Sequence, residues 1–192
     1  MTLRHLNYNS AMKTIARLIT ALVLFSSVPA FSQGNDFTIF AGLQIPGKIT
    51  LTNAASTGTS GATQIITDPK NAGTYGIRFG HGKFLGGEHT VAYSSNFMAG
   101  KAKALILNSN FRIQAPTPVL RPYATAGLGT IATWGGGVSD IGAKFAINYG
   151  GGVKLMAGPV GVNVSLRGYT LPSVQSQTLN LMETSVGINF GF

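Results

Sequence analysis

The chain has 192 residues and a formal net charge of +9, and it contains 26 glycines but no cysteine. Only 10% of its residues are charged, against about 25% in a typical soluble domain, and its length allows one domain. The lack of cysteine excludes a disulfide framework, a thiolate metal site and a cysteine nucleophile. The basic residues are scattered along the chain, with no cluster beyond Lys101 and Lys103, which argues against a nucleic-acid partner.

The N-terminal segment has the pattern of an export signal. Lys13 and Arg17 precede an apolar run at residues 18–25, and Ala30-Phe31-Ser32 places small residues at the two positions that a signal peptidase reads. The run is shorter than the roughly 20 apolar residues that a membrane-spanning helix needs. The sequence therefore predicts a signal peptide at residues 1–32, cleaved after Ser32, and export further disfavours nucleic acid.

The mature chain is predicted to comprise residues 33–192. Residues 1–11 are polar and add nothing to the signal, which makes Met12 an alternative start. Cleavage removes Arg4, Lys13 and Arg17, which leaves 11 basic and 5 acidic side chains and a net charge of +6.

The mature chain contains eight segments in which large apolar residues alternate with small or polar ones, the period of a β-strand. The last is the clearest: Val186, Ile188 and Phe190 share one face, and Gly187 and Asn189 share the other. The segment at 122–131 is the weakest. The eight predicted strands lie within residues 37–44, 75–80, 90–97, 105–113, 122–131, 144–155, 160–167 and 182–192.

The predicted connections alternate between two ends of the molecule. Those at one end, here called the outer end, are mostly long, and those at the other, the inner end, are short, which is typical of a membrane-spanning barrel. The link at 99–100 is a short exception. The outer connections are predicted at 45–71, 99–100, 132–142 and 170–181, and the inner turns at 82–87, 115–120 and 157–159.

The charged residues of these segments lie on the face occupied by Gly, Ser, Thr and Asn. An eight-stranded barrel interior is just wide enough to be filled by side chains. A soluble barrel such as a lipocalin would place the apolar face inside, whereas a membrane barrel places it in lipid. We expect the second arrangement, which makes residues 33–192 an all-β, eight-stranded, antiparallel, up-and-down transmembrane β-barrel. The predicted polar network of its lumen consists of Arg78, Glu88, Arg112, Lys154, Arg167 and Glu183.

This set of residues has two interpretations. Buried charges must be paired, so a satisfied polar plug is favoured over a conductance path. Because basic residues outnumber acidic ones in the set, we also expect one or more of them to face water near a mouth of the barrel.

The chain resembles a known family of membrane proteins at several motifs. It ends in Gly-Ile-Asn-Phe-Gly-Phe, and Phe190 and Phe192 resemble the C-terminal signal that the bacterial barrel-assembly machinery reads. Arg121-Pro122-Tyr123, residues 147–154 and Leu166-Arg167-Gly168-Tyr169 resemble the outer-membrane β-barrels that include OmpA-like, OmpX-like and opacity-type proteins. The resemblance implies a place in the bacterial outer membrane, with the assembly machinery, outer-membrane lipid and lipopolysaccharide as partners, and without a peptidoglycan-binding domain.

Two functions compete with a structural or surface-interaction role through the outer loops: a narrow diffusion pore and a lipid-A-modifying enzyme. Enzymes of this barrel type imply a His, Ser and acid set near the outer leaflet, whereas His81 and His89 flank an inner turn, and Ser94, Ser95 and Asp140 are not expected near them. These histidines, eight residues apart, also lack a zinc-site spacing. We therefore expect no catalytic site, metal or cofactor.

Two features near the outer loops remain open. Trp134, expected in the third outer loop, is either an anchor at the membrane interface or a loop contact, and the first is favoured because tryptophan prefers that depth. Lys101 and Lys103 either contact lipopolysaccharide phosphates or form a solvated strand end, and the second is favoured.

Overall fold

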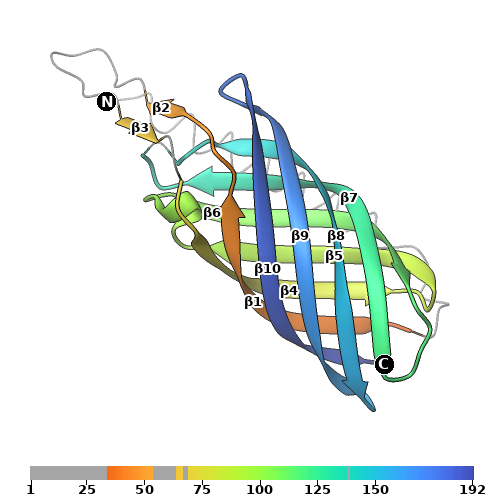
Figure 1. The fold of residues 1–192 in the computed structure, drawn as a ribbon. Coiled ribbons are helices and arrows are strands. Elements are labelled where there is room, and N and C mark those ends of the chain that lie inside the picture. The colour runs from red at the N-terminus through yellow and green to blue at the C-terminus, as the bar shows by residue number, and fades with distance from the viewer. Residues whose placement is uncertain (1–33, 54–63, 67–68, 138) are drawn as a thin grey trace, which may run out of the picture. The chain divides into compact units, whose positions relative to one another are not determined.

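The computed structural model describes residues 34–53, 64–66, 69–137 and 139–192 (Figure 1). The predicted signal peptide at 1–32, its cleavage site and part of the first outer connection lie outside the described residues. Within the described part of the chain, no helix has the length and apolar character needed to cross a bilayer.

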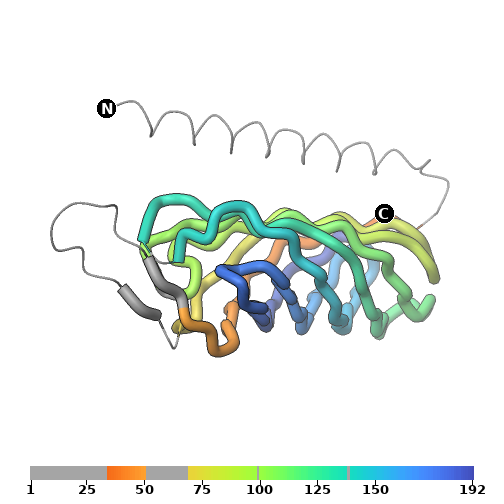
Figure 2. The backbone as a smooth tube through the Cα atoms, turned by 90° about the horizontal axis from the view of Figure 1, so that it is seen from above, coloured from red at the N-terminus to blue at the C-terminus, as the bar shows by residue number. Residues whose placement is uncertain are grey.

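Eight antiparallel strands close into one barrel, as the sequence predicted (Figure 1, Figure 2). Each strand pairs with its neighbours in chain order, and β1 closes the barrel by pairing with both β4 and β10. Strands on the near and far walls cross in Figure 1, because barrel strands tilt relative to the barrel axis. The strands are β1 (Asp36–Pro46), β4 (Ala72–His81), β5 (Leu85–Ser94), β6 (Lys103–Gln114), β7 (Leu120–Trp134), β8 (Ala143–Ala157), β9 (Val160–Val174) and β10 (Gln177–Gly191).

The connections differ from the prediction in several places. The outer connection between β5 and β6 spans 95–102 and contains the short 3-10 helix η1 (Phe97–Ala99), so the expected tight link at 99–100 was wrong. The first outer connection carries a two-stranded hairpin of β2 (Leu51–Asn53) and β3 (Gln64–Ile66). The remaining turns are at 82–84, 115–119 and 158–159 on the inner end and at 135–142 on the outer end.

The predicted outer loop at 170–181 is largely strand. Strands β9 and β10 continue to a two-residue turn, Gln175–Ser176, in which both residues have positive φ. Pairing between β8 and β9 ends at Ile147–Thr170, so Pro172 lies on an edge where its missing N–H costs no ladder hydrogen bond. The β9–β10 hairpin therefore extends beyond the point where β9 stops pairing with β8.

The two faces of the barrel have the inside-out polarity expected of a membrane protein. Outward residues such as Ile39 and Ile188, opposite each other in the β1–β10 ladder, are each 53% exposed, whereas the alternating inward residues Thr38 and Asn189 are buried and hydrogen-bonded to each other at 2.7 Å. Closure of the sheet satisfies the backbone, which is the condition for strands to lie in lipid. The chain is thus a transmembrane β-barrel.

Strand length divides the barrel into a low side and a high side. Strands β4 and β5 have ten residues each. At about 3.3 Å per residue and a tilt of about 40°, such a strand rises about 25 Å, which matches the apolar band of a membrane barrel. The 15 residues of each strand from β7 to β10 rise about 38 Å on the same geometry. Along β9 and β10 the outward side chains change from apolar, at Leu166 and Met182, to polar, at the hydrogen-bonded pair Thr170 and Asn180. This change marks where the two strands leave the bilayer.

Candidate functional site

The lumen is filled by charged side chains in its inner half and middle. All six residues that the sequence placed in a polar network are here, and each is at most 2% exposed. At the inner end, Asp36 accepts two cations at once: Arg112 Nη1 lies 2.6 Å from Asp36 Oδ2, and Lys154 Nζ lies 2.7 Å from Asp36 Oδ1. Arg112 also donates to the carbonyl oxygen of Gly82 at 3.2 Å.

A second group of charges lies at the middle of the barrel. Arg78 Nη2 is 2.8 Å from Glu183 Oε1 and also donates to Ser185 Oγ at 3.0 Å, while Arg78 Nη1 donates to Ser165 Oγ at 2.9 Å. The Arg78 guanidinium stacks over the Phe40 ring, 3.7 Å from its centroid. This arginine of β4 is therefore held by residues of three other strands, β1, β9 and β10.

The third group is the ion pair between Arg167 of β9 and Glu88 of β5, which lies across the lumen. Tyr123 lies between this pair and the inner group, because its ring is 6.0 Å from Arg167 and 5.1 Å from Lys154, and its hydroxyl donates to Asn163 Oδ1 at 3.0 Å. The three groups thus form one stacked arrangement along the barrel axis.

The sequence missed Asp36, which occupies the inner end of this arrangement. It lies one residue before the first predicted strand segment, and its partners are 76 and 118 residues away along the chain. The expectation that one or more of the basic residues face water was wrong. Four cations share three carboxylates inside the barrel, and the surplus cation is also buried, because the one carboxylate of Asp36 pairs with both Arg112 and Lys154.

The outer half of the lumen is mainly apolar, which the sequence did not predict. Buried inward residues from β6, β7, β9 and β10 pack there against Phe97 and Met98 of the 95–102 connection. The segment after β1 is fastened to the same end, since Gly47 N donates to Asn180 O at 2.7 Å and Gln177 Nε2 donates to Thr50 O at 2.8 Å. The apolar members of this cluster include Ile49, Phe97, Met98, Ile106, Ile131, Leu171, Val174, Leu179 and Leu181.

The barrel is similar to solved structures of bacterial surface and outer-membrane proteins. The Neisserial surface protein A structure aligns with a TM-score of 0.60 and 16% identity, covering 84% of this chain and 98% of that chain. OprG from Pseudomonas aeruginosa aligns with a TM-score of 0.53 and 11% identity, covering 84% of this chain and 97% of that chain. The fold is that of a bacterial outer-membrane β-barrel.

The outer membrane enzyme PagL also aligns, with a TM-score of 0.49 and 16% identity, covering 82% of this chain and 99% of that chain. No protein-family model and no curated protein matches the sequence. Because one fold can host unrelated functions, the role of this outer-membrane barrel depends on its own residues.

The loop lengths orient the barrel. Outer-membrane barrels have short periplasmic turns and longer extracellular loops, so the inner end is periplasmic and the outer end is extracellular. Trp134 is the last residue of β7 and not a loop residue. It extends an outward aromatic row, with ring centroids 6.2 Å from Tyr93, which is in turn 5.5 Å from Tyr75. Such a row is typical of the membrane interface.

Both histidines lie on the outward face near the periplasmic turn that they flank. Their rings stack with centroids 5.7 Å apart, and the two ring nitrogens of His89 have no hydrogen-bond partner. Ser109 is opposite His89 in the β5–β6 ladder, but Glu88 points into the lumen, where it pairs with Arg167. Within the described residues, no group of three or more His, Cys, Asp or Glu could hold a metal ion.

The two phenylalanines of the predicted assembly signal lie at the periplasmic end of β10. Phe190 points outward between Phe37 and Val160 of the neighbouring strands, and Phe192 is exposed while its backbone exchanges two hydrogen bonds with Asn35. Recognition by the assembly machinery remains a prediction.

Proposed function

We propose that this outer-membrane barrel is a non-enzymatic, non-conducting scaffold that displays its extracellular elements for surface interaction. The observation that carries the proposal is the double closure of its lumen. Stacked ion pairs fill the periplasmic half and the middle, and an apolar cluster fills the extracellular half. The two closures differ in chemistry, so one condition does not readily open both.

A pore would have to disrupt both layers. Separating a buried ion pair leaves uncompensated charges, at a cost of about 3–5 kcal/mol for each pair broken. A conducting path would also have to admit water among Phe97, Leu171 and Leu179, which are fully buried. The described residues therefore favour a plug over the alternative of a narrow diffusion pore.

An enzyme is the weaker alternative. A general base must reach its proton within about 3 Å, directly or through one water. His89 has no hydrogen-bond partner, and the nearby Glu88 is on the opposite face of the sheet. The arrangement at these two histidines thus offers no hydrogen-bonded His, Ser and acid set.

The extracellular end supplies surfaces for interaction. The β9–β10 hairpin extends beyond the bilayer with polar outward side chains and an apolar inner side that packs on Phe97 and Met98. Lys103 is opposite Trp134 in the β6–β7 ladder, which places a cation beside the aromatic row, at the depth of lipid phosphates. We take lipopolysaccharide phosphates as the first partner of this rim, with Lys101 beside Lys103.

Planar-bilayer recording of the refolded protein tests the closed lumen. We expect no current above that of the bare bilayer in 1 M KCl between −100 and +100 mV. Leu179→Asp, which introduces a charge into the apolar cluster, is the matched variant expected to produce current fluctuations. Stable openings of the unaltered protein would contradict the scaffold proposal and favour the pore.

Binding to lipopolysaccharide tests the rim. Lys103→Gln should weaken sedimentation of the refolded protein with lipopolysaccharide aggregates. Lys70→Gln, at an exposed position before β4, is the matched control. Equal effects of the two substitutions would count against a specific role of Lys103 in the extracellular rim.

A further inference from the structure

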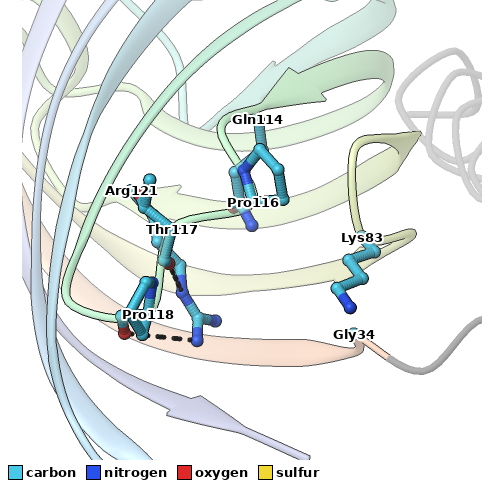
Figure 3. Close-up of a pocket in the computed structure, with 7 residues that line it drawn as sticks. All are labelled: Gly34, Lys83, Gln114, Pro116, Thr117, Pro118 and Arg121. Atoms are coloured by element: carbon cyan, nitrogen blue, oxygen red, sulfur yellow. Dashed lines mark hydrogen bonds between the residues drawn. The ribbon is translucent and has the colours of Figure 1, made fainter.

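A pocket of about 370 Å³ lies at the periplasmic mouth of the barrel (Figure 3). It is lined by Gly34 before β1, Lys83 in the β4–β5 turn, Gln114 at the end of β6, Arg121 in β7 and the turn at 116–118. Its volume falls within the range of small-molecule sites. It is separate from the lumen network and from the extracellular rim.

The walls of the pocket are held in place by hydrogen bonds. Arg121 Nε donates to Thr117 O at 2.9 Å and Arg121 Nη2 donates to Pro118 O at 3.4 Å, as the dashed lines in Figure 3 show. Gln114 N donates to Phe84 O at 2.8 Å, which joins the two turns that carry the lining residues. A preorganised wall reduces the ordering that a ligand would otherwise impose on binding.

The charge of this end is strongly positive. Among the described residues, neither Lys83 nor Arg121 forms an ion pair, and Lys83 is exposed. Directly deeper in the barrel, Arg112 and Lys154 share the single carboxylate of Asp36. Four basic side chains thus accompany one acidic side chain, and a cleft lined mainly by one sign of charge attracts ions of the other sign.

Gln114 adds a hydrogen-bonding requirement. It is only 5% exposed, and its carbonyl oxygen is buried without a partner. A buried acceptor without a partner is unfavourable, so a ligand that brings a hydrogen-bond donor beside its negative charge is preferred. A simple carboxylate has no such donor at neutral pH, whereas a phosphate monoanion has a P–OH and an ethanolamine phosphate has an ammonium group.

We propose that this periplasmic pocket binds a phosphate-bearing group, with Lys83 and Arg121 contacting the phosphate oxygens and Gln114 accepting from its donor. Two sources share this chemistry: a free phosphate or phosphate ester in the periplasm, and the headgroup of a phospholipid in the periplasmic leaflet. The site does not depend on whether the extracellular surface binds a partner.

The first experiment titrates the full mature protein, refolded in a phosphorus-free maltoside detergent, with inorganic phosphate at constant ionic strength. Backbone amide shifts should change at Lys83, at Gln114 and in the turn at 116–118. Lys83→Gln, whose exposed side chain leaves folding unaffected, should weaken phosphate binding about tenfold, because a hydrogen bond to a charged group is worth that much or more. Lys70→Gln, at an exposed position before β4 at the extracellular end, is the matched control and should leave the shifts at the pocket unchanged.

The second arm distinguishes the sources. Native mass spectrometry of the protein released from nanodiscs that contain phosphatidylethanolamine should show a retained lipid, lost in Lys83→Gln, if the headgroup is the ligand. Sulfate, which has the same tetrahedral shape but no donor at neutral pH, should bind more weakly than phosphate. Equal binding of sulfate, equal loss in Lys70→Gln, or no local shifts together with no retained lipid would each overturn the proposal.

Discussion

Replacing Asp36 with Asn tests how the lumen balances its charges. One carboxylate neutralises two buried cations, with Arg112 Nη1 at 2.6 Å and Lys154 Nζ at 2.7 Å. Loss of one partner from a buried ion pair costs about 3–5 kcal/mol. Because Asp36→Asn leaves two cations uncompensated, we expect the free energy of unfolding to fall by about 5 kcal/mol, the upper end of that range.

Lys154→Met should have a much smaller effect, although it removes the other half of one of these pairs. The substitution removes the surplus cation, keeps Arg112 paired with Asp36, and leaves three carboxylates for three arginines. Replacing a buried charge with an apolar side chain of similar length is often neutral, so we expect a change within about 1 kcal/mol. In the double variant, Lys154→Met should recover about 2 kcal/mol of the Asp36→Asn loss, because the two residues are coupled.

Urea unfolding of protein refolded into phosphatidylcholine vesicles measures these changes. Trp134 is the only tryptophan of the chain, so its fluorescence reports on one defined position at the extracellular interface. Asp140→Asn, in an extracellular loop where Asp140 accepts hydrogen bonds from Thr133 and Gly136, is the control and should cost about 1 kcal/mol. An Asp36→Asn loss below that of the control, or a Lys154→Met loss equal to that of Asp36→Asn, would show that Asp36 does not balance two buried cations.

Two further predictions follow from the packing and the orientation. Gly80→Ala should lower the free energy of unfolding by about 1–3 kcal/mol, because its methyl group would meet the pinned Arg112 guanidinium, whereas Gly73→Ala has no neighbour within 4 Å and should be neutral in the same urea assay. The chain has no cysteine, so a single introduced cysteine can be labelled specifically. Ser176→Cys should react with a membrane-impermeant maleimide on intact cells, and Lys83→Cys should react only after permeabilisation. The reverse pattern would contradict the orientation.

The architecture could be predicted from the sequence because the alternation of apolar with small or polar residues reflects which face of each strand meets lipid. A one-residue shift would move every side chain of a strand to the other face, so eight consistent alternating segments predicted both the strands and their polarity. The boundaries were less accurate. The β9–β10 turn uses Gln175 and Ser176 at positive φ without the glycine or asparagine that usually marks such a turn, and Pro172 interrupts the strand pattern before it, so the hairpin was predicted as a loop.

The interior could be predicted only in part. Arg78, Glu88 and Arg167 were identifiable because a charge on the alternating small or polar face must point into the lumen. Their ion pairs join residues that are 79 and 105 apart along the chain, and no spacing rule supplies such contacts. The apolar cluster was missed for a related reason: in β6, Ile106 points inward beside the outward Leu105 and Leu107, so this part of the strand is apolar on both faces.

Fractionation of cells followed by gel electrophoresis with and without boiling tests the central claim, a closed eight-stranded barrel in the outer membrane, most directly. We expect the protein to be recovered with outer membranes and its mobility in SDS to change only after boiling, because the folded barrel resists the detergent. Recovery in the soluble periplasmic fraction with no heat-dependent shift would contradict it.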